Sequence, residues 1–206
     1  MSLTREHLTQ EIIEAGRFLY GRGWSPATSS NYSTRLSATQ ALLTVSGKHK
    51  GQLGLDDVLA TDLSGNSLEV GKKPSAETLL HTQLYCWRPE IGAVLHTHSV
   101  NATVLSRLTP GDSIEFEDYE LQKAFSGVST HESKVRVPIF DNDQDIERLA
   151  AKVQPWLQAH PECVGYLIRG HGLYTWGARM SDALRQIEAF EFLFECELKT
   201  RAVLAR

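Results

Sequence analysis

The sequence is poor in cysteine, with only Cys86, Cys163 and Cys196 among 206 residues. These three lie far apart and form no Cys-x-x-Cys pair, so neither a disulfide framework nor a thiolate zinc site is predicted. Long hydrophobic runs are missing as well, because no stretch approaches the roughly 20 apolar residues of a membrane span, and the first residues contain no signal-peptide core. We therefore expect a cytoplasmic protein without a membrane partner.

Positive charge is also scarce, with 21 Lys and Arg against 25 Asp and Glu and a formal net charge of −4. Nucleic-acid binding needs clustered basic residues, so we expect no nucleic-acid partner. The one dense basic stretch, Lys48-His49-Lys50, is short enough to suit a single phosphate. The hydrophobic content of 41% is typical of a globular protein, and we expect residues 1–206 to form one domain.

Hydrophobic spacing predicts helices and strands along the whole chain. Helical spacing is found near the N-terminus, after Pro74, over residues 102–108, after the acidic cluster 141–143, and from Ser181 onward. Short β-like runs predict strands over 32–36, 41–45, 58–62, 91–95, 135–140, 163–168 and 173–176. This pattern predicts an α/β fold in which helices cover a mostly antiparallel sheet.

The final predicted helix carries Phe190, Phe192 and Phe194, which cannot all lie on one narrow stripe. We therefore expect part of its surface to contact another subunit.

The strongest chemical signal is His96-Thr97-His98 at the end of a predicted buried strand. Residues i and i+2 of a strand project to the same side, so both imidazoles should face one point. His171, in the tight turn Gly170-His171-Gly172, is the best third ligand. Three imidazoles suit a catalytic zinc ion. A chance His-x-His pair with hydrogen-bonded rings explains the pair alone about equally well, but the two motifs together favour a metal site.

The motif Pro74-Ser75-Ala76-Glu77, followed by His96-Thr97-His98 and Gly170-His171-Gly172, resembles the class II aldolase family. The resemblance spans nearly the whole chain. It implies a three-layer α/β/α fold, one Zn²⁺ per subunit held by the three histidines, a homotetramer with active sites near subunit boundaries, and a small phosphorylated sugar as substrate. Residues 46–51, 74–84, 90–106 and 169–177 are most similar to the dehydratases of that family, which implies a lyase that removes water.

The resemblance also implies substrate contacts. Asn31, the turn Ser46-Gly47, and Ser75 match phosphate-binding loops of the family, and N–H groups at glycine turns and helix N-termini do bind anions. Without the family, the less favoured alternative is that Asn31, Ser46 and Ser75 are only turn and cap residues. The aldolases usually carry a second serine where this chain has Ala76, so we expect one hydroxyl contact to the phosphate to be missing.

Two carboxylates compete for the acid/base role. In the aldolases this group matches Glu77, and in the dehydratases it matches Glu120. On sequence alone, Glu120 is better explained as a solvated charge in the acidic run 115–120. The dehydratase resemblance instead implies that Glu120 takes the C3 proton of a 2-ketopentose phosphate and returns a proton to the departing C4 hydroxyl. Glu77 would then contact the substrate or the metal site.

Two alternatives to a dehydratase remain open. A sugar-phosphate aldolase or 4-epimerase would break the C3–C4 bond with the same metal, because function depends on site residues and not on the fold. A metal-free interaction module like the head of adducin would keep the fold without chemistry, but the presence of His96, His98 and His171 argues against it.

Overall fold

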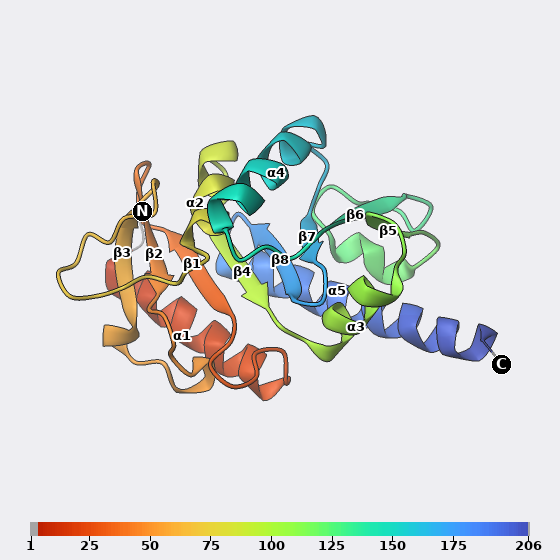
Figure 1. Ribbon diagram of the computed structural model, residues 1–206, viewed down its shortest axis with the longest axis horizontal. Helices are drawn as coiled ribbons and strands as arrows, with labels where there is room; N and C mark the ends of the chain where they lie inside the picture. The colour runs from red at the N-terminus through yellow and green to blue at the C-terminus, as the bar shows by residue number, and fades with distance from the viewer. Residues whose placement is uncertain (1–3, 206) are drawn as a thin grey trace.

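The computed structural model describes residues 4–205 (Figure 1). Within this range, the α-helices are α1 (Arg5–Gly21), α2 (Thr78–Trp87), α3 (Val100–Leu108), α4 (Ile146–Ala159) and α5 (Met180–Leu204). The strands are β1 (Asn31–Arg35), β2 (Gln40–Thr44), β3 (Val58–Asp62), β4 (Ala93–Thr97), β5 (Ser113–Phe116), β6 (Val135–Phe140), β7 (Gly165–Ile168) and β8 (Gly172–Gly177). Short 3-10 helices are η1 (Lys50–Gln52), η2 (Leu55–Asp57) and η3 (Glu120–Ala124).

The strands form one eight-stranded sheet in the order β3-β2-β1-β4-β8-β7-β6-β5. Only the β6–β7 pair is parallel, and every other described pair is antiparallel. This confirms the predicted mostly antiparallel sheet. The order brings β1, β4 and β8 together at the centre although they lie far apart in the sequence.

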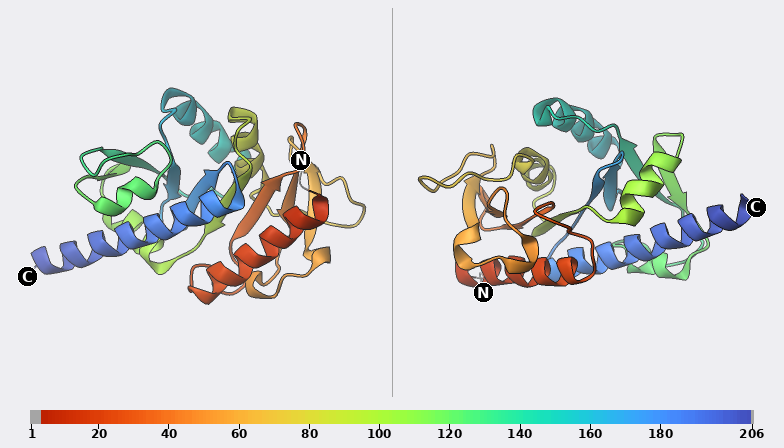
Figure 2. Two further views of the ribbon diagram at one scale, coloured as in Figure 1. Left: turned by 180° about the vertical axis from the view of Figure 1, so that it is seen from behind. Right: turned by 60° about the horizontal axis from the view of Figure 1, so that its bottom comes forward.

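Helices cover both faces of the sheet. α1 and α5 lie on the face of the sheet that is turned to the viewer in the left view of Figure 2, and α2 and α4 lie on the opposite face. Each face has its own buried core: Ile12 and Phe190 belong to the first, and Leu84 and Val153 to the second. These packed faces confirm the three-layer α/β/α arrangement. Over residues 4–205, no helix is both long enough and apolar enough to cross a membrane.

Helix boundaries differ from the sequence prediction at two points that matter for the site. α2 begins at Thr78, with Glu77 as the N-cap residue, because Ser75 instead makes a turn in which its Oγ accepts a hydrogen bond from the Glu77 N–H at 3.3 Å. α4 begins after Asp145, whose side chain caps the Arg148 N–H at 3.0 Å. The edge strand β5 was not predicted, and the other predicted elements match within two residues.

The aromatic residues of α5 divide between two environments. Phe190 and Phe194 are fully buried, whereas Phe192 is 51% exposed. The three rings therefore do not share one stripe, and a subunit contact at Phe192 remains a prediction.

Candidate active site

The register of the three central strands assembles the site. Asn31 of β1 pairs with His96 of β4, and His96 pairs with Tyr174 of β8. Paired residues of neighbouring strands point to the same face, so the three side chains lie side by side. Gly172 allows the close approach of β8 to β4, because a Cβ atom there would lie 2.0 Å from the Thr97 carbonyl oxygen.

The three predicted ligand histidines converge, and Glu77 joins them. The His171 Nε2 atom lies 3.3 Å from the His96 Nε2 and 3.2 Å from the His98 Nε2. The Glu77 carboxylate lies 3.3 Å from the His96 Nε2 and 3.3 Å from the His171 Nε2. One ligand atom from each of these four residues falls within 4.8 Å of the others. Such a cluster has the donors and the spacing of a divalent-metal site.

The surroundings of the histidines leave ring nitrogens available to a metal. The Nδ1 of His96 lies 2.9 Å from the Leu173 carbonyl oxygen, and the Nδ1 of His171 lies 3.3 Å from the Asn142 side-chain oxygen. Because carbonyl oxygens accept from an N–H, each Nε2 keeps a free lone pair. Burial, reinforced by the neighbouring histidines, lowers the pKa of His96 and His98 well below the ordinary 6.5.

A chain of hydrogen bonds fixes the Glu77 carboxylate. It accepts from the Asn31 side-chain N–H at 2.7 Å and from the Tyr174 hydroxyl at 3.0 Å. The Asn31 side-chain oxygen accepts in turn from Nε2 of His81, whose Nδ1 contacts the Ser33 hydroxyl at 2.8 Å. His81 is fully buried, which lowers its pKa to about 3, so its ring is neutral. Glu77 is thereby aimed at the histidines, and the Asn31 side chain keeps one of its two N–H donors for another partner.

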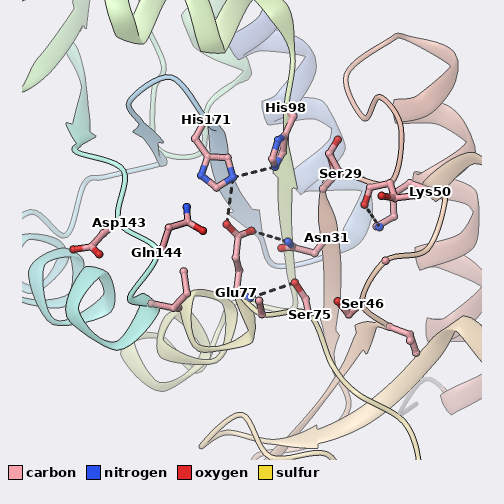
Figure 3. A pocket seen from close by; sticks show the side chains of 16 residues that line it. Ser29, Asn31, Ser46, Lys50, Ser75, Glu77, His98, Asp143, Gln144 and His171 are labelled. Carbon is pink, nitrogen blue, oxygen red and sulfur yellow. Dashed lines mark hydrogen bonds and ion pairs between the residues drawn. The ribbon is translucent and has the colours of Figure 1, made fainter.

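A pocket of about 330 Å³ opens above the cluster (Figure 3). Its size lies within the usual range for small-molecule sites. The residues that line it include most of those predicted for the site, namely Asn31, Ser46, Gly47, Ser75, Glu77, His98 and His171. His96 lies beneath the pocket and is fully buried. Two lining residues, Gly47 and Ser30, adopt φ values of +73° and +71°, and the left-handed conformation is strained for Ser30.

Glu120 is the predicted site residue that the structure does not bring to the histidines. It begins η3, its side chain is 74% exposed, and it pairs with Lys123, which keeps its pKa below the usual range. It lines a different cavity together with residues of α5, among them Phe192. Of the residues that the structure describes, those lining the histidine pocket do not include Glu120.

Two residues of the site were not predicted from the sequence. His81 has the sequence context of an ordinary helix residue, and Tyr174 that of an ordinary strand residue. Their roles depend on contacts with Asn31 and Glu77, which come from distant segments. Lys50, from the basic stretch that we expected to suit a phosphate, also lines the pocket.

The chain is similar in sequence and in fold to known proteins. A methylthioribulose-1-phosphate dehydratase of Pseudomonas fluorescens (strain Pf0-1) is 90% identical, over 100% of this chain and 99% of that protein. A methylthioribulose-1-phosphate dehydratase of Pseudomonas aeruginosa PAO1 is 82% identical, over 97% of each chain. The crystal structure of an L-fuculose-1-phosphate aldolase from Thermus thermophilus superposes with a TM-score of 0.79 at 24% identity, covering 98% of this chain and 100% of the other.

Residues 10–198, nearly the whole chain, match the family described as Class II Aldolase and Adducin N-terminal domain. The fold, the relatives and the matched residues agree, and the chain belongs to this class II aldolase family.

Proposed function

We propose that this chain dehydrates 5-methylthioribulose 1-phosphate to 2,3-diketo-5-methylthiopentyl 1-phosphate, a step of methionine salvage. The observation that carries the proposal is the cluster of three histidines and Glu77 at the base of a pocket lined by the predicted phosphate-binding residues. Relatives that are 82–90% identical and are named for this dehydratase activity support the choice of substrate. A phosphorylated sugar is made and used inside cells, so we also propose a cytoplasmic location.

We propose one Zn²⁺ per subunit, held by His96, His98 and His171, with Glu77 beside it. Zinc–nitrogen bonds of about 2.0–2.1 Å at tetrahedral angles separate two nitrogens by about 3.3–3.4 Å. The observed Nε2 separations of 3.2 and 3.3 Å suit this geometry. When bound, the zinc acts as a Lewis acid that polarises the C2 carbonyl of the substrate and acidifies the hydrogen on C3.

Proton transfer falls to Glu120 in this proposal. Its carboxylate removes the proton from C3 and then gives a proton to the departing C4 hydroxyl, so that water leaves and an enol forms. Tautomerisation of the enol gives the 2,3-diketone. Asn31, Ser46, Gly47 and Ser75 hold the phosphate at the other side of the pocket, where Gly47 provides a turn of the kind that binds anions.

Glu120 can perform this role only if another subunit supplies it. In its own chain it lies on the exposed η3 segment, outside the histidine pocket. The cavity around it is partly apolar, with Leu121 and Phe192 both exposed. We therefore propose a homotetramer in which η3 of one subunit reaches the pocket of its neighbour. Symmetric assemblies commonly build sites in this way from two surfaces of one chain.

The test is incubation of the purified protein with 5-methylthioribulose 1-phosphate, followed by identification of the product. A diketone that retains all carbons supports the dehydratase. Fragments from cleavage between C3 and C4, or a product epimeric at C4, would identify an aldolase or a 4-epimerase instead. A protein that contains no metal and leaves the substrate unchanged would indicate an adducin-like interaction module.

A further inference from the structure

The contact between η1 and α1 sends the side chain of Lys50 into the protein. A Cβ atom on Gly16 would lie 2.4 Å from the Lys50 carbonyl oxygen, and one on Gly51 would lie 2.5 Å from the ring of Tyr20. The two glycines therefore let η1 lie directly against α1. As a result Lys50 is only 1% exposed, although it lines the histidine pocket.

Lys48, two residues earlier, lies at the surface. Its side chain is 50% exposed and its ammonium lies 2.9 Å from the Asp57 carboxylate. Lys50 has no such counterion: within residues 4–205, no carboxylate oxygen lies within 4.0 Å of its Nζ atom. The Lys50 ammonium donates only to two backbone carbonyl oxygens, those of Lys48 at 2.6 Å and Thr28 at 3.4 Å. One of its three N–H donors is left for another partner.

The other charged side chains at the pocket already have partners. Glu77 accepts two hydrogen bonds and faces the histidines. Asp143 pairs with Arg148 and Lys152 on the surface. A buried ammonium without a directly paired counterion is costly. Burial lowers the pKa of Lys50 to about 8, although the nearby charge of Asp57 acts to raise it, and most of the side chain is still protonated at neutral pH. An anionic ligand would supply a direct counterion.

We propose that Lys50 binds the phosphate group of the substrate and supplies its positive countercharge. Figure 3 shows Lys50 on the same wall of the pocket as Asn31 and Ser46, away from Asp143. The role in turnover rests on the proposed sugar-phosphate substrate. The binding of a free phosphate does not depend on it.

The experiment is calorimetric titration of the zinc-loaded, full-length protein with inorganic phosphate. Lys50→Met keeps the aliphatic stem and removes the ammonium, and we expect its phosphate dissociation constant to rise at least about tenfold, the value of one charge-assisted hydrogen bond. Lys48→Met is the matched control and should bind phosphate like the parent. In turnover, Lys50→Met should raise KM for the phosphorylated substrate far more than it changes kcat, with unchanged zinc content.

The results distinguish a failure of the Lys50 phosphate site from a failure of the proposed dehydratase function. Phosphate binding by Lys50→Met within about twofold of the parent would overturn it, and so would a parent protein that does not bind phosphate. If Lys50→Met does not fold, Lys50→Gln provides the same comparison with a neutral polar side chain, and retained affinity there counts equally against it. If phosphate binding depends on Lys50 but no diketone forms, the dehydratase assignment fails and the phosphate site stands.

Discussion

Mixed oligomers of two inactive variants test whether a neighbouring subunit supplies the acid/base. His98→Ala removes one imidazole from the metal cluster and leaves η3 intact. Glu120→Gln has the opposite defect: it leaves the metal cluster intact and should retain the proposed zinc, because Glu120 lies outside the histidine pocket. Loss of a general acid/base costs about 10²–10⁴ in rate, and loss of a metal ligand should abolish turnover. Each pure variant should therefore retain roughly 1% of the parental rate or less.

The expected recovery of activity in the mixture follows from the separation of His98 and Glu120 within each chain. In the proposed assembly, an intact site needs the histidines of one subunit and the Glu120 of another, since Glu120 of the same chain lines a different cavity. In a random equal mixture, half of the sites have intact histidines, and half of those face an intact Glu120. About a quarter of the parental activity should therefore return, whether the sites lie in a dimer or in a ring.

The assay measures diketone formation after the two variants are unfolded together and refolded, with each pure variant treated in parallel. The matched control is a mixture of His98→Ala and His171→Ala, whose defects fall in the same cluster, so no site can be restored. If the Glu120→Gln mixture is no more active than the mean of its two components, Glu120 acts within its own chain or has no catalytic role.

Three further predictions concern the metal cluster and its support. His96→Ala, His98→Ala and His171→Ala should each lower zinc content and abolish turnover. None should unfold the protein, because the packed core does not depend on metal. If elemental analysis finds undiminished zinc in one variant, the residue changed in that variant is not a ligand. Glu77→Gln should weaken zinc binding about 10–100-fold in chelator competition, because the amide loses the negative charge beside the rings; a dead variant with full zinc would instead support direct proton transfer by this residue. Acid should destabilise the metal-free protein, since burial lowers the pKa of His81 to about 3 while the unfolded chain protonates near 6.5. The contribution of neutral His81 to the free energy of unfolding is fully present above pH 6.5 and is lost by about 1.4 kcal/mol per pH unit towards pH 3. In denaturant unfolding, the free energy of His81→Gln should therefore depend less on pH than that of the parent. An equal pH dependence in the two proteins would contradict a buried, neutral His81.

The sequence carried enough local information to predict most elements and the three histidines. Periodicity is a local property, and both His-x-His on a strand and His between two glycines restrict where a side chain can point. The pairing of Asn31, His96 and Tyr174 is different, because it depends on the register of three strands from distant parts of the chain. No pattern within any one of these strands specifies that register.

Glu77 was ambiguous in the sequence because its role depends on where α2 begins. A helix starting directly after Ser75 would carry Glu77 within its first turn, where an acidic residue is favourable for the helix dipole alone. In the structure the turn at Ser75 delays the helix to Thr78, and Glu77 becomes the cap residue. Its side chain makes no capping hydrogen bond and is free to meet the histidines.

The two carboxylates have opposite environments, and this difference supports their division of labour. Glu77 is held by two hydrogen-bond donors and by the rings of the cluster, which suits a group that orients or ligates a metal and does not need to move. Glu120 is exposed and ionised beside Lys123, with a lowered pKa, so alone it would be a weak base. Burial against a neighbouring subunit would remove water from Glu120 and raise its pKa towards neutrality, where proton transfer is most efficient. Assembly would thus activate the proposed acid/base, while Glu77 would stay with the metal cluster.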